Sequence, residues 1–276
     1  MMKTRITPWT ILSVLLKLLL IVIFVFPFFW MISTGFKTYQ ESIAVPPTLL
    51  PAVPQFENFV KVWQSGNYFL YLTNSLVISC GTLLLQFVVL VPAAYSFAKF
   101  EFKGRSLLFG LVMVAFMVPT QVTFISIFNM MSRAGWLKTL WPQIIPHAAN
   151  AFGIFLLRQN FMQIPDELLE SARLDNATEF QILTKVMLPM GKPTLVSILM
   201  LSFISTWNDY FWPFIMASTE KVYPLTIAIA HLRDVEGSYD WQIIMAGNTI
   251  LVVPILIVYA LFHKRIVRAF AYSGIK

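Results

Sequence analysis

The sequence predicts an all-α membrane protein with six transmembrane helices. Of its 276 residues, 58% are hydrophobic and 12% are charged, whereas soluble domains carry about a quarter charged residues. The apolar residues cluster into runs of roughly 20, the length that crosses about 30 Å of hydrocarbon, and the period-2 alternation of barrel strands is missing. Because backbone groups in lipid must be hydrogen-bonded within the protein, these runs are predicted to be helices. They cover residues 11–33, 71–97, 106–130, 140–157, 194–217 and 242–263.

The first predicted span, 11–33, is expected to be retained. It is too long for the apolar core of a secretory signal, and it lacks an Ala-x-Ala cleavage site. The next segment holds four prolines within residues 46–54, which favour extended backbone, and then an amphipathic stretch, 56–63, expected to lie along the membrane interface. Cys80, in the second span, is the only cysteine, so no disulfide or cysteine metal site is expected within the chain.

The distribution of basic residues predicts the orientation in the membrane. A short positive turn, 99–105, joins spans two and three, and residues 132–139 join spans three and four on the other side. With both termini in the cytoplasm, the inner segments hold 13 of the 20 Lys and Arg residues and the outer segments hold six. This bias is the positive-inside rule. It accounts for the net charge of +7, so a nucleic-acid partner is not expected.

Prolines inside the predicted spans allow two interpretations. A proline removes one backbone donor and kinks a helix, and in transporters such breaks often lie near the transport pathway. Helix bundles also tolerate proline, because neighbouring groups satisfy the freed carbonyls, and for any single proline we favour this second interpretation. The prolines are Pro92, Pro119, Pro146, Pro213 and Pro254.

A polar loop, 159–193, separates spans four and five and is predicted to be cytoplasmic. The loop predicts contact with a partner outside the bilayer, and the alternative is an amphipathic linker that rests on the membrane. No internal repeat or low-complexity segment is evident, so residues 1–276 are interpreted as one transmembrane domain. Five of the chain's 13 acidic residues lie in this loop: Asp166, Glu167, Glu170, Asp175 and Glu179.

Local signals within the loop predict two short helices at an angle. Pro165 suits the first turn of a helix, and acidic residues follow it at the positive helix end. Asn176 can adopt the left-handed backbone that ends this helix, and it can also cap a second helix, 178–187, with Glu179 as its capping-box partner. The second helix is expected to end before Pro189. The residues expected to pack against the membrane domain are Leu168, Leu169, Ala172 and Leu174.

Residues 170–172 read Glu-Ser-Ala, Asn176 follows after three residues, and residues 186–189 read Val-Met-Leu-Pro after nine more. This spacing resembles the signature loop of permease subunits in bacterial ATP-binding-cassette importers, whose pattern is Glu-Ala-Ala, three residues, Gly, nine residues and Ile-x-Leu-Pro. Asparagine follows glycine in its tolerance of left-handed backbone, so the turn is expected to persist.

Further segments resemble the carbohydrate-uptake branch of this family and are similar to the smaller permease of the maltose system. They are residues 71–76, 93–100, 119–122, 152–159, 206–213 and 245–247. The resemblance implies a multi-pass permease of the bacterial cytoplasmic (inner) membrane, which translocates a sugar or oligosaccharide delivered by an extracytoplasmic binding protein.

The resemblance also implies the partners and the coupling residues. Such permeases pair with a second homologous permease and sit on a dimer of ATP-binding-cassette ATPases, so ATP and Mg are expected on the ATPase, with no cofactor or metal on this chain. The chain lacks the phosphate-binding Gly-x-x-x-x-Gly-Lys-Ser/Thr loop and is not expected to be an enzyme. A coupling helix within residues 165–189 would dock on the ATPase. The implied coupling residues are Glu170, Ser171, Ala172, Asp175, Asn176, Ala177, Leu188 and Pro189.

Polar and aromatic residues in the spans are candidates for the substrate pathway. Asp209, one of few ionisable groups in the spans, lies within an aromatic stretch, 207–212, that could contact a sugar. The alternative, which we prefer, is an interfacial aromatic belt with a helix-packing Asn–Asp pair. The pathway candidates are Asn74, Gln121, Asn129, Trp207, Asn208 and Asp209.

Two other functions stay open. An importer of the same class could carry a glycerol phosphate or a polyamine, although a phosphate cargo should require arginines facing the pathway, and the spans contain none. An ion-coupled secondary transporter would usually show paired carboxylates, broken helices at mid-membrane or inverted repeats, and these are not evident.

Overall fold

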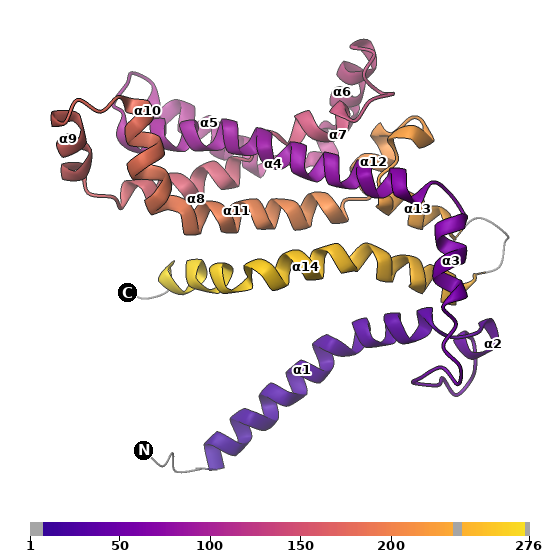
Figure 1. Ribbon diagram of the computed structural model, residues 1–276. Coiled ribbons are helices and arrows are strands. Elements are labelled where there is room, and N and C mark those ends of the chain that lie inside the picture. The colour runs from indigo at the N-terminus through magenta and orange to yellow at the C-terminus, as the bar shows by residue number, and fades with distance from the viewer. Residues whose placement is uncertain (1–7, 234–238, 274–276) are drawn as a thin grey trace. The chain divides into compact units, whose positions relative to one another are not determined.

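The computed structural model describes residues 8–233 and 239–273, and every regular element within them is a helix (Figure 1). The described residues therefore have the all-α architecture that the apolar runs predict. They form two compact units. One contains the described residues up to Tyr68 together with Ala228–Pro254, and the other contains Phe69–Ile227 together with the described residues from Ile255 onward. The single domain 1–276 stays a prediction.

The first unit contains α1 (Pro8–Gly35), α2 (Tyr39–Ser42), α3 (Glu57–Gln64), the end of α13 (Leu225–His231) and the start of α14 (Trp241–Ser273). The proline-rich segment before α3 has no helix, as predicted. Within α3, Asn58 and Val62 are buried four residues apart while Val60 and Trp63 are exposed. The predicted amphipathic helix is therefore confirmed.

Buried and charged side chains hold the segment between α1 and α3. Lys37 is 1% exposed, and its ammonium donates to the Thr48 carbonyl at 2.5 Å. The Glu41 carboxylate accepts from the amides of Thr38 and Ala52, each at 2.9 Å. These bonds, that of Ala52 foremost, hold the pKa of Glu41 below its ordinary value. The proline-rich stretch between α2 and α3 is thus fixed by bonds to two charged side chains despite having no helix.

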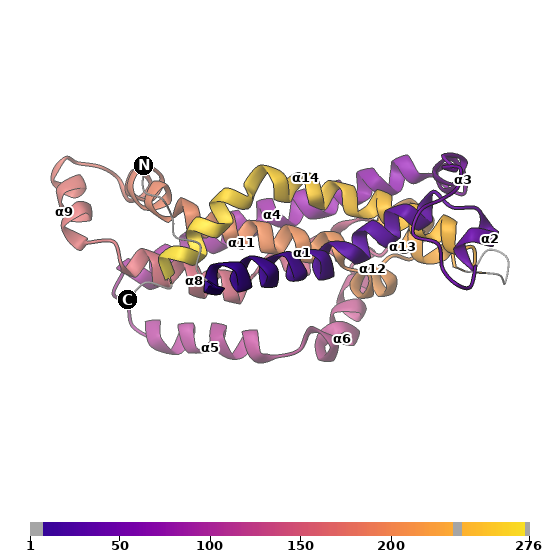
Figure 2. The same ribbon diagram turned by 90° about the horizontal axis from the view of Figure 1, so that it is seen from below.

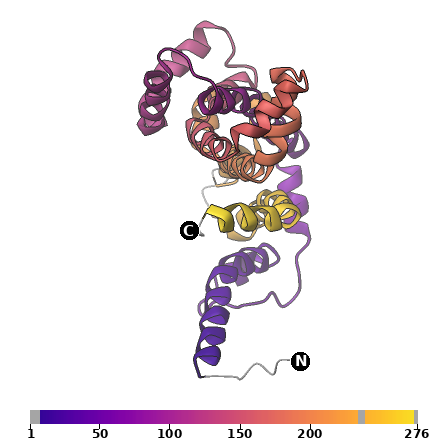
Figure 3. The ribbon, with the colours of Figure 1, turned by 90° about the vertical axis from the view of Figure 1, so that its left-hand side faces the viewer.

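The second unit contains the helices that carry the polar loop. They are α4 (Tyr68–Lys99, from Phe69), α5 (Arg105–Met117), α6 (Thr120–Arg133), α7 (Trp141–Ile144), η1 (Ile145–His147), α8 (Ala151–Met162), α9 (Asp166–Leu174), α10 (Glu179–Ile182), the π-helical turn η2 (Leu183–Met187), α11 (Leu188–Asn208), α12 (Phe211–Met216) and η3 (Glu220–Val222), and α13 begins there. Its core includes Leu90, Leu157 and Ile198, each at most 1% exposed. The helices α9 and α10 lie at the end where α4 finishes (Figures 1 and 3).

Four described helices are long and apolar enough to cross a membrane: Trp9–Gly35, Tyr68–Lys99, Glu179–Asn208 and Trp241–Leu261. They correspond to predicted spans one, two, five and six. A fifth crossing results if α5 and α6 together count as one span. The total of six spans and the cytoplasmic position of both termini stay predictions.

The predicted span 106–130 is not a continuous helix. The axes of α5 and α6 differ by 99° (Figure 2). Val118 is extended, with ψ at 119°, and Pro119 occupies the N-cap position of α6. The residue before a proline avoids the helical region, and the proline has no amide to donate. The interpretation that the helix bundle tolerates the proline within a continuous helix is therefore wrong for Pro119, whereas Pro92 and Pro254 do lie inside helices.

The predicted span 140–157 is also interrupted. The helix α7 gives way to η1, which contains Pro146, and α8 starts anew with Asn150 as its N-cap, whose side chain accepts from the Gly153 amide at 2.8 Å. The 12 residues of α8 extend about 18 Å at 1.5 Å per residue, which is short of a hydrocarbon core of about 30 Å. The predicted span 194–217 begins earlier than expected, at Leu188, and its helix ends at Asn208 before α12.

Candidate functional site

The turn that ends α9 has the predicted left-handed residue. Asn176 has φ at 60°, the only positive φ among the described residues other than glycine. Its amide donates to the Arg173 carbonyl, and the Ala177 amide donates back to the Ala172 carbonyl, each at 3.0 Å. These bonds satisfy carbonyls at the helix end, as left-handed C-terminal turns do. The sequence therefore identified the correct residue for this turn.

The start of the second helix differs from the prediction. Thr178, not Asn176, is the N-cap of α10, and its capping-box partner is Gln181, not Glu179. The Thr178 hydroxyl accepts from the Gln181 amide at 3.3 Å, and the Gln181 side chain accepts from the Thr178 amide at 2.8 Å. Threonine with Gln three residues later is an equally good capping pair, and Asn176 is already used in the preceding turn.

The second helix does not end before Pro189. The chain continues from α10 through the π-helical turn η2 into α11, where Pro189 is the second residue. Pro189 therefore lies inside the continuous helix Glu179–Asn208, directly after the π-helical turn. The expected end at Pro189 is therefore wrong. Leu188 and Pro189, which resemble the closing motif of the loop, belong to a helix that is long and apolar enough to cross a membrane.

The loop is attached to the end of α4 at two points. The Lys99 ammonium donates to the Ile164 carbonyl and to the Asp166 carboxylate, each at 2.6 Å. The Tyr95 hydroxyl donates to Glu179 at 2.6 Å, and Arg173 donates to the same carboxylate at 2.9 Å. The bond from Lys99 and its charge hold the pKa of Asp166 below its ordinary value. Sequence reasoning missed these attachments, because no local signal joins residues so far apart along the chain.

The coupling candidates divide into an exposed and a covered set. Leu169 is 1% exposed, and Ala172 and Ala177 are half-buried against the same core. Leu168 and Leu174 were expected to pack with Leu169, but they are 44% and 83% exposed, because the helix turns them away from the core. We name the exposed coupling candidates of α9 and its turn, Glu170, Ser171, Asp175 and Asn176, together with the exposed Leu174, the α9 surface.

An apolar side chain lies just beyond the α9 surface. Phe180, at the start of α10, is 74% exposed. Leu174, in the same polar loop, is a second exposed apolar side chain, and exposed apolar side chains of this size in a polar loop are typical of a surface that another protein covers. Sequence reasoning missed Phe180 and assigned Leu174 to the packed face, although a Leu and a Phe among charged neighbours in a loop were a usable signal.

The pathway candidates are mostly engaged in holding a nearby segment. Asn74 is 5% exposed and donates to the carbonyls of Lys221 and Tyr223 at 3.0 and 2.9 Å. The Asp209 carboxylate accepts from the Trp212 backbone amide at 3.2 Å, and the backbone carbonyl of Asp209 accepts from the Thr226 hydroxyl at 2.9 Å. Both residues therefore fix the segment 220–226.

The other pathway candidates do not form one site with these. Trp207 is 2% exposed and stacks on Phe203, and the Asn208 amide donates to the Ile204 carbonyl within its own helix. Gln121 and Asn129 lie on α6 and are exposed. Because the bond of Asn208 lies within its own helix, it shows no packing between helices, and both the pathway role of the six residues and the helix-packing alternative stay predictions.

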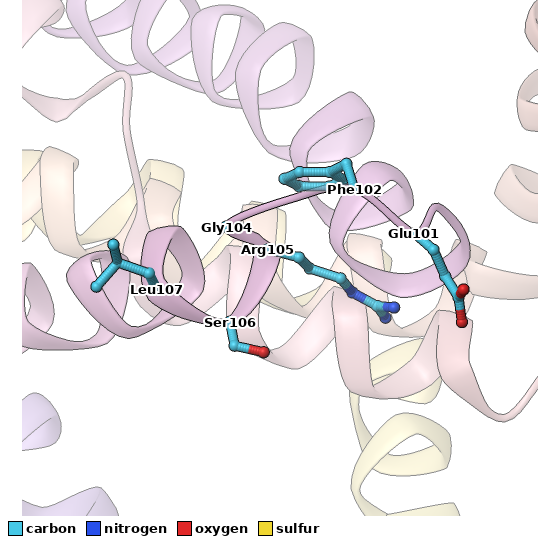
Figure 4. Close-up of a pocket in the computed structure, with 6 residues that line it drawn as sticks. All are labelled: Glu101, Phe102, Gly104, Arg105, Ser106 and Leu107. Atoms are coloured by element: carbon cyan, nitrogen blue, oxygen red, sulfur yellow. The ribbon is translucent and has the colours of Figure 1, made fainter.

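A hollow of about 300 Å³ lies beside the turn between α4 and α5 (Figure 4). Glu101, Phe102 and residues 104–107 line it. The guanidinium of Arg105, one of the lining residues, donates to the Phe97 carbonyl at 2.7 and 3.0 Å and to the Ala98 carbonyl at 3.1 Å. These carbonyls end α4, and a cation at a helix C-terminus is stabilising. The hollow therefore marks a helix junction held by Arg105.

The conformation of Asn176 gives a first prediction. Replacement by glycine should leave stability unchanged or raise it slightly, because glycine adopts φ at 60° without steric cost. Replacement by valine should destabilise the turn by about 1–2 kcal/mol, since a β-branched residue is strained there. Thermal unfolding of the two detergent-solubilised variants measures the difference. Equal unfolding temperatures for glycine and valine would contradict the left-handed turn.

The Lys99–Asp166 pair gives a pH-dependent prediction. Because the pKa of Asp166 is lowered from 3.8 by the folded structure, the pair stabilises the start of α9 above that pH and is lost as pH falls through the lowered value. Hydrogen-exchange protection of the α9 amides should therefore fall on acidification. Asp166→Asn should show low protection at neutral pH and little further change, and identical pH profiles for the two proteins would refute the assignment.

The sequence match that decides the family covers residues 90–272. It is to the family described as binding-protein-dependent transport system inner membrane component. The chain belongs to this family. As an inner membrane component it is a multi-pass membrane protein with a role in transport.

Two similar proteins extend the comparison over nearly the whole chain. The arabinooligosaccharides transport system permease protein AraQ of Bacillus subtilis is 28% identical, over 94% of this chain and 93% of that protein. The sn-glycerol-3-phosphate transport system permease protein UgpE of Escherichia coli is 27% identical, over 96% of this chain and 98% of that protein. These relatives are permeases and not enzymes.

A solved structure shows the fold of the inner membrane component. It is a chain of a bacterial ABC transporter involved in the import of the acidic polysaccharide alginate, with a TM-score of 0.82 and 24% identity, over 93% of this chain and 95% of that chain. The interrupted helices at 117–120 and 144–151 therefore belong to a chain with an importer permease fold.

Proposed function

We propose that this inner membrane component is the permease subunit of an ATP-driven importer that translocates a sugar or oligosaccharide. The observation that carries the proposal is the similarity to a permease of arabinooligosaccharide transport along 94% of the chain. The alginate transporter with the same fold adds support. An extracytoplasmic binding protein would deliver the cargo, in keeping with the family's description.

The α9 surface is proposed as the contact with the ATPase. Its acidic and amide side chains, Glu170, Asp175 and Asn176, would bind polar groups of the ATPase, and Leu174 would add apolar contact area. Ser171, with half-buried Ala172 and Ala177, leaves room for a close approach. Closure of an ATPase dimer on ATP and Mg would then displace α9, and with it the helices to which the loop is attached.

The remaining partners follow from the same proposal. A second homologous permease would complete the membrane part, and this chain would need no cofactor or metal of its own. Within the described residues, no group of three His, Cys, Asp or Glu side chains is placed to hold a metal ion. ATP hydrolysis would take place on the ATPase.

A glycerol phosphate is the second candidate cargo, because UgpE is similar over 96% of the chain. A phosphate site should contain arginine donors. Arg105 on α5 and Arg158 on α8 both donate to the Phe97 carbonyl at the end of α4. This use of their guanidinium groups favours a neutral cargo. A polyamine cargo has no supporting observation, and an ion-coupled transporter does not fit a binding-protein-dependent family.

The test is uptake of a labelled panel in a strain that lacks this gene. The panel contains mono- and oligosaccharides, a glycerol phosphate and a polyamine. Loss of uptake of one saccharide, restored by the gene, is the expected result. If all saccharides still enter and the glycerol phosphate does not, the sugar assignment fails while the importer assignment stands.

A further inference from the structure

The last turn of α4 contacts both ends of the segment that carries α9. Lys99 bonds to Ile164 and Asp166 where α9 begins, and Tyr95 bonds to Glu179 just after α9, all at 2.6 Å. Residues four apart lie on one face of a helix. One face of α4 therefore holds the entry and the exit of the α9 segment.

On the α4 side these contacts are buried. The Lys99 side chain is 5% exposed and Tyr95 is 4% exposed, whereas the side chain of Asp166 is 76% exposed. A buried ammonium has lost its water and depends on its protein acceptors, and bonds to charged groups contribute more than neutral ones. Glu179 also accepts from Arg173, in the last turn of α9, at 2.9 Å. The start and the end of α9 are thus both joined to α4.

The same turn of α4 joins two further helices. The Phe97 carbonyl accepts from the Nε atoms of Arg105, on α5, and Arg158, on α8, each at 3.0 Å. The guanidinium of Arg158 also lies 4.1 Å from the centre of the Phe109 ring on α5. A displacement of this turn would therefore act on α5 and α8 as well.

The other end of α4 holds the segment 220–225. Asn74 donates to the carbonyls of Lys221 and Tyr223, and the Ser75 hydroxyl accepts from the Leu225 amide at 2.8 Å. Tyr71 donates to the carboxylate of Glu220 in the same segment. The two sets of contacts lie 20 to 28 residues apart on α4, which is about 30–42 Å at 1.5 Å per residue.

The geometry points to Tyr95 and Lys99 as positioning residues that transmit a displacement of α9 to α4. This inference rests on the proposed docking of the α9 surface on an ATPase. The chain also connects α9 to α8 and α11 directly, and Leu169 packs into the core to which α4 contributes. Tyr95 and Lys99 add side-chain bonds from α4 to both ends of the α9 segment. When α9 moves with the ATPase, their bonds move the end of α4, and the contacts at its far end move the segment 220–225.

The test uses Tyr95→Phe combined with Lys99→Met in the complete importer, purified through a tag on this chain and reconstituted in vesicles. The quantities measured are the amount of bound ATPase, its rate of ATP hydrolysis, and uptake of the cargo that the panel identifies. Bound ATPase and basal hydrolysis should equal the wild type. Uptake should fall roughly tenfold, within the range of typical coupling free energies.

Two matched variants separate positioning from general damage. Lys103→Met removes an exposed lysine from the adjoining turn and should leave uptake unchanged. Lys99→Arg keeps donors for both acceptors and should keep most of the uptake. If the double variant fails to insert, Tyr95→Phe alone removes only one hydroxyl and should still lower uptake severalfold with ATPase bound.

Two results would overturn the inference. One is normal uptake in the double variant, and the other is loss of bound ATPase in parallel with uptake, which would mean that Tyr95 and Lys99 only maintain the shape of the α9 surface. A different variant, Glu170→Lys with Asn176→Asp, tests the docking proposal. If that variant retained the bound ATPase, the docking proposal would fail.

Discussion

Uptake is expected to be abolished when Glu170 is replaced by lysine and Asn176 by aspartate in the same chain. Both residues are exposed on the α9 surface, so the changes reverse one charge and add another without disturbing the core. Aspartate tolerates left-handed backbone nearly as well as asparagine does, so the turn should persist. Loss of a central interface residue typically costs about 2 kcal/mol or more, a weakening of roughly 30-fold.

The measurement is co-purification of the ATPase with the tagged chain, together with uptake of the cargo. Membrane insertion should equal that of the wild type, because neither residue contacts the core. Glu167→Gln, also on an exposed side of α9, is the control and should keep both activities. Normal uptake with the ATPase bound in the double variant would refute the docking assignment.

The sequence predicted those features that depend on neighbouring residues. Apolar length predicted four helices that the structure contains, and the tolerance of asparagine for left-handed backbone predicted the turn at Asn176. Pro165 predicted the start of α9 to within one residue. Each of these signals acts within a few residues of the feature that it specifies, so reading the chain locally was sufficient.

The helix breaks were harder to predict, because a proline that stays inside a helix and a proline that ends one have the same local sequence signal. Pro92 and Pro254 continue their helices, whereas Pro119 ends one and begins another at 99°. Each of these prolines lacks a backbone N–H donor, but tertiary packing decides whether the helix continues or the chain turns. The interruption of 140–157 has the same origin, with Pro146 in a 3-10 turn followed by an Asn cap.

The attachments of the loop could not be predicted, because they join distant parts of the chain. Lys99 is separated from Asp166 by 67 positions and Tyr95 from Glu179 by 84. Charge alone gave each acidic residue in the loop several possible basic partners. The same limit applies to Asn74, whose amide bonds to a segment 147 and 149 positions away and not to the other pathway candidates.

The second large effect is expected from Gly153→Val, at the closest packing of α8. A Cβ atom at this position would lie 2.4 Å from Cδ1 of Leu90 on α4 and 2.9 Å from Cγ2 of Ile198 on α11. Both neighbours are at most 1% exposed, so they have little space into which to move. Overpacking of this kind costs about 1–3 kcal/mol, and the two extra methyl groups of valine should place it at the upper end.

Thermal unfolding in detergent measures this cost, and Gly110→Val provides the control. Gly110 lies on α5, where an added Cβ meets no atom within 4 Å, so valine there should change stability by less than about 1 kcal/mol. Gly153→Ala should fall between the two valine variants, since it adds only the Cβ. Because α4, α8 and α11 meet at Gly153, a destabilised variant should also lose uptake before it loses its helices. Equal unfolding temperatures for the two valine variants would mean that α8 does not pack between α4 and α11.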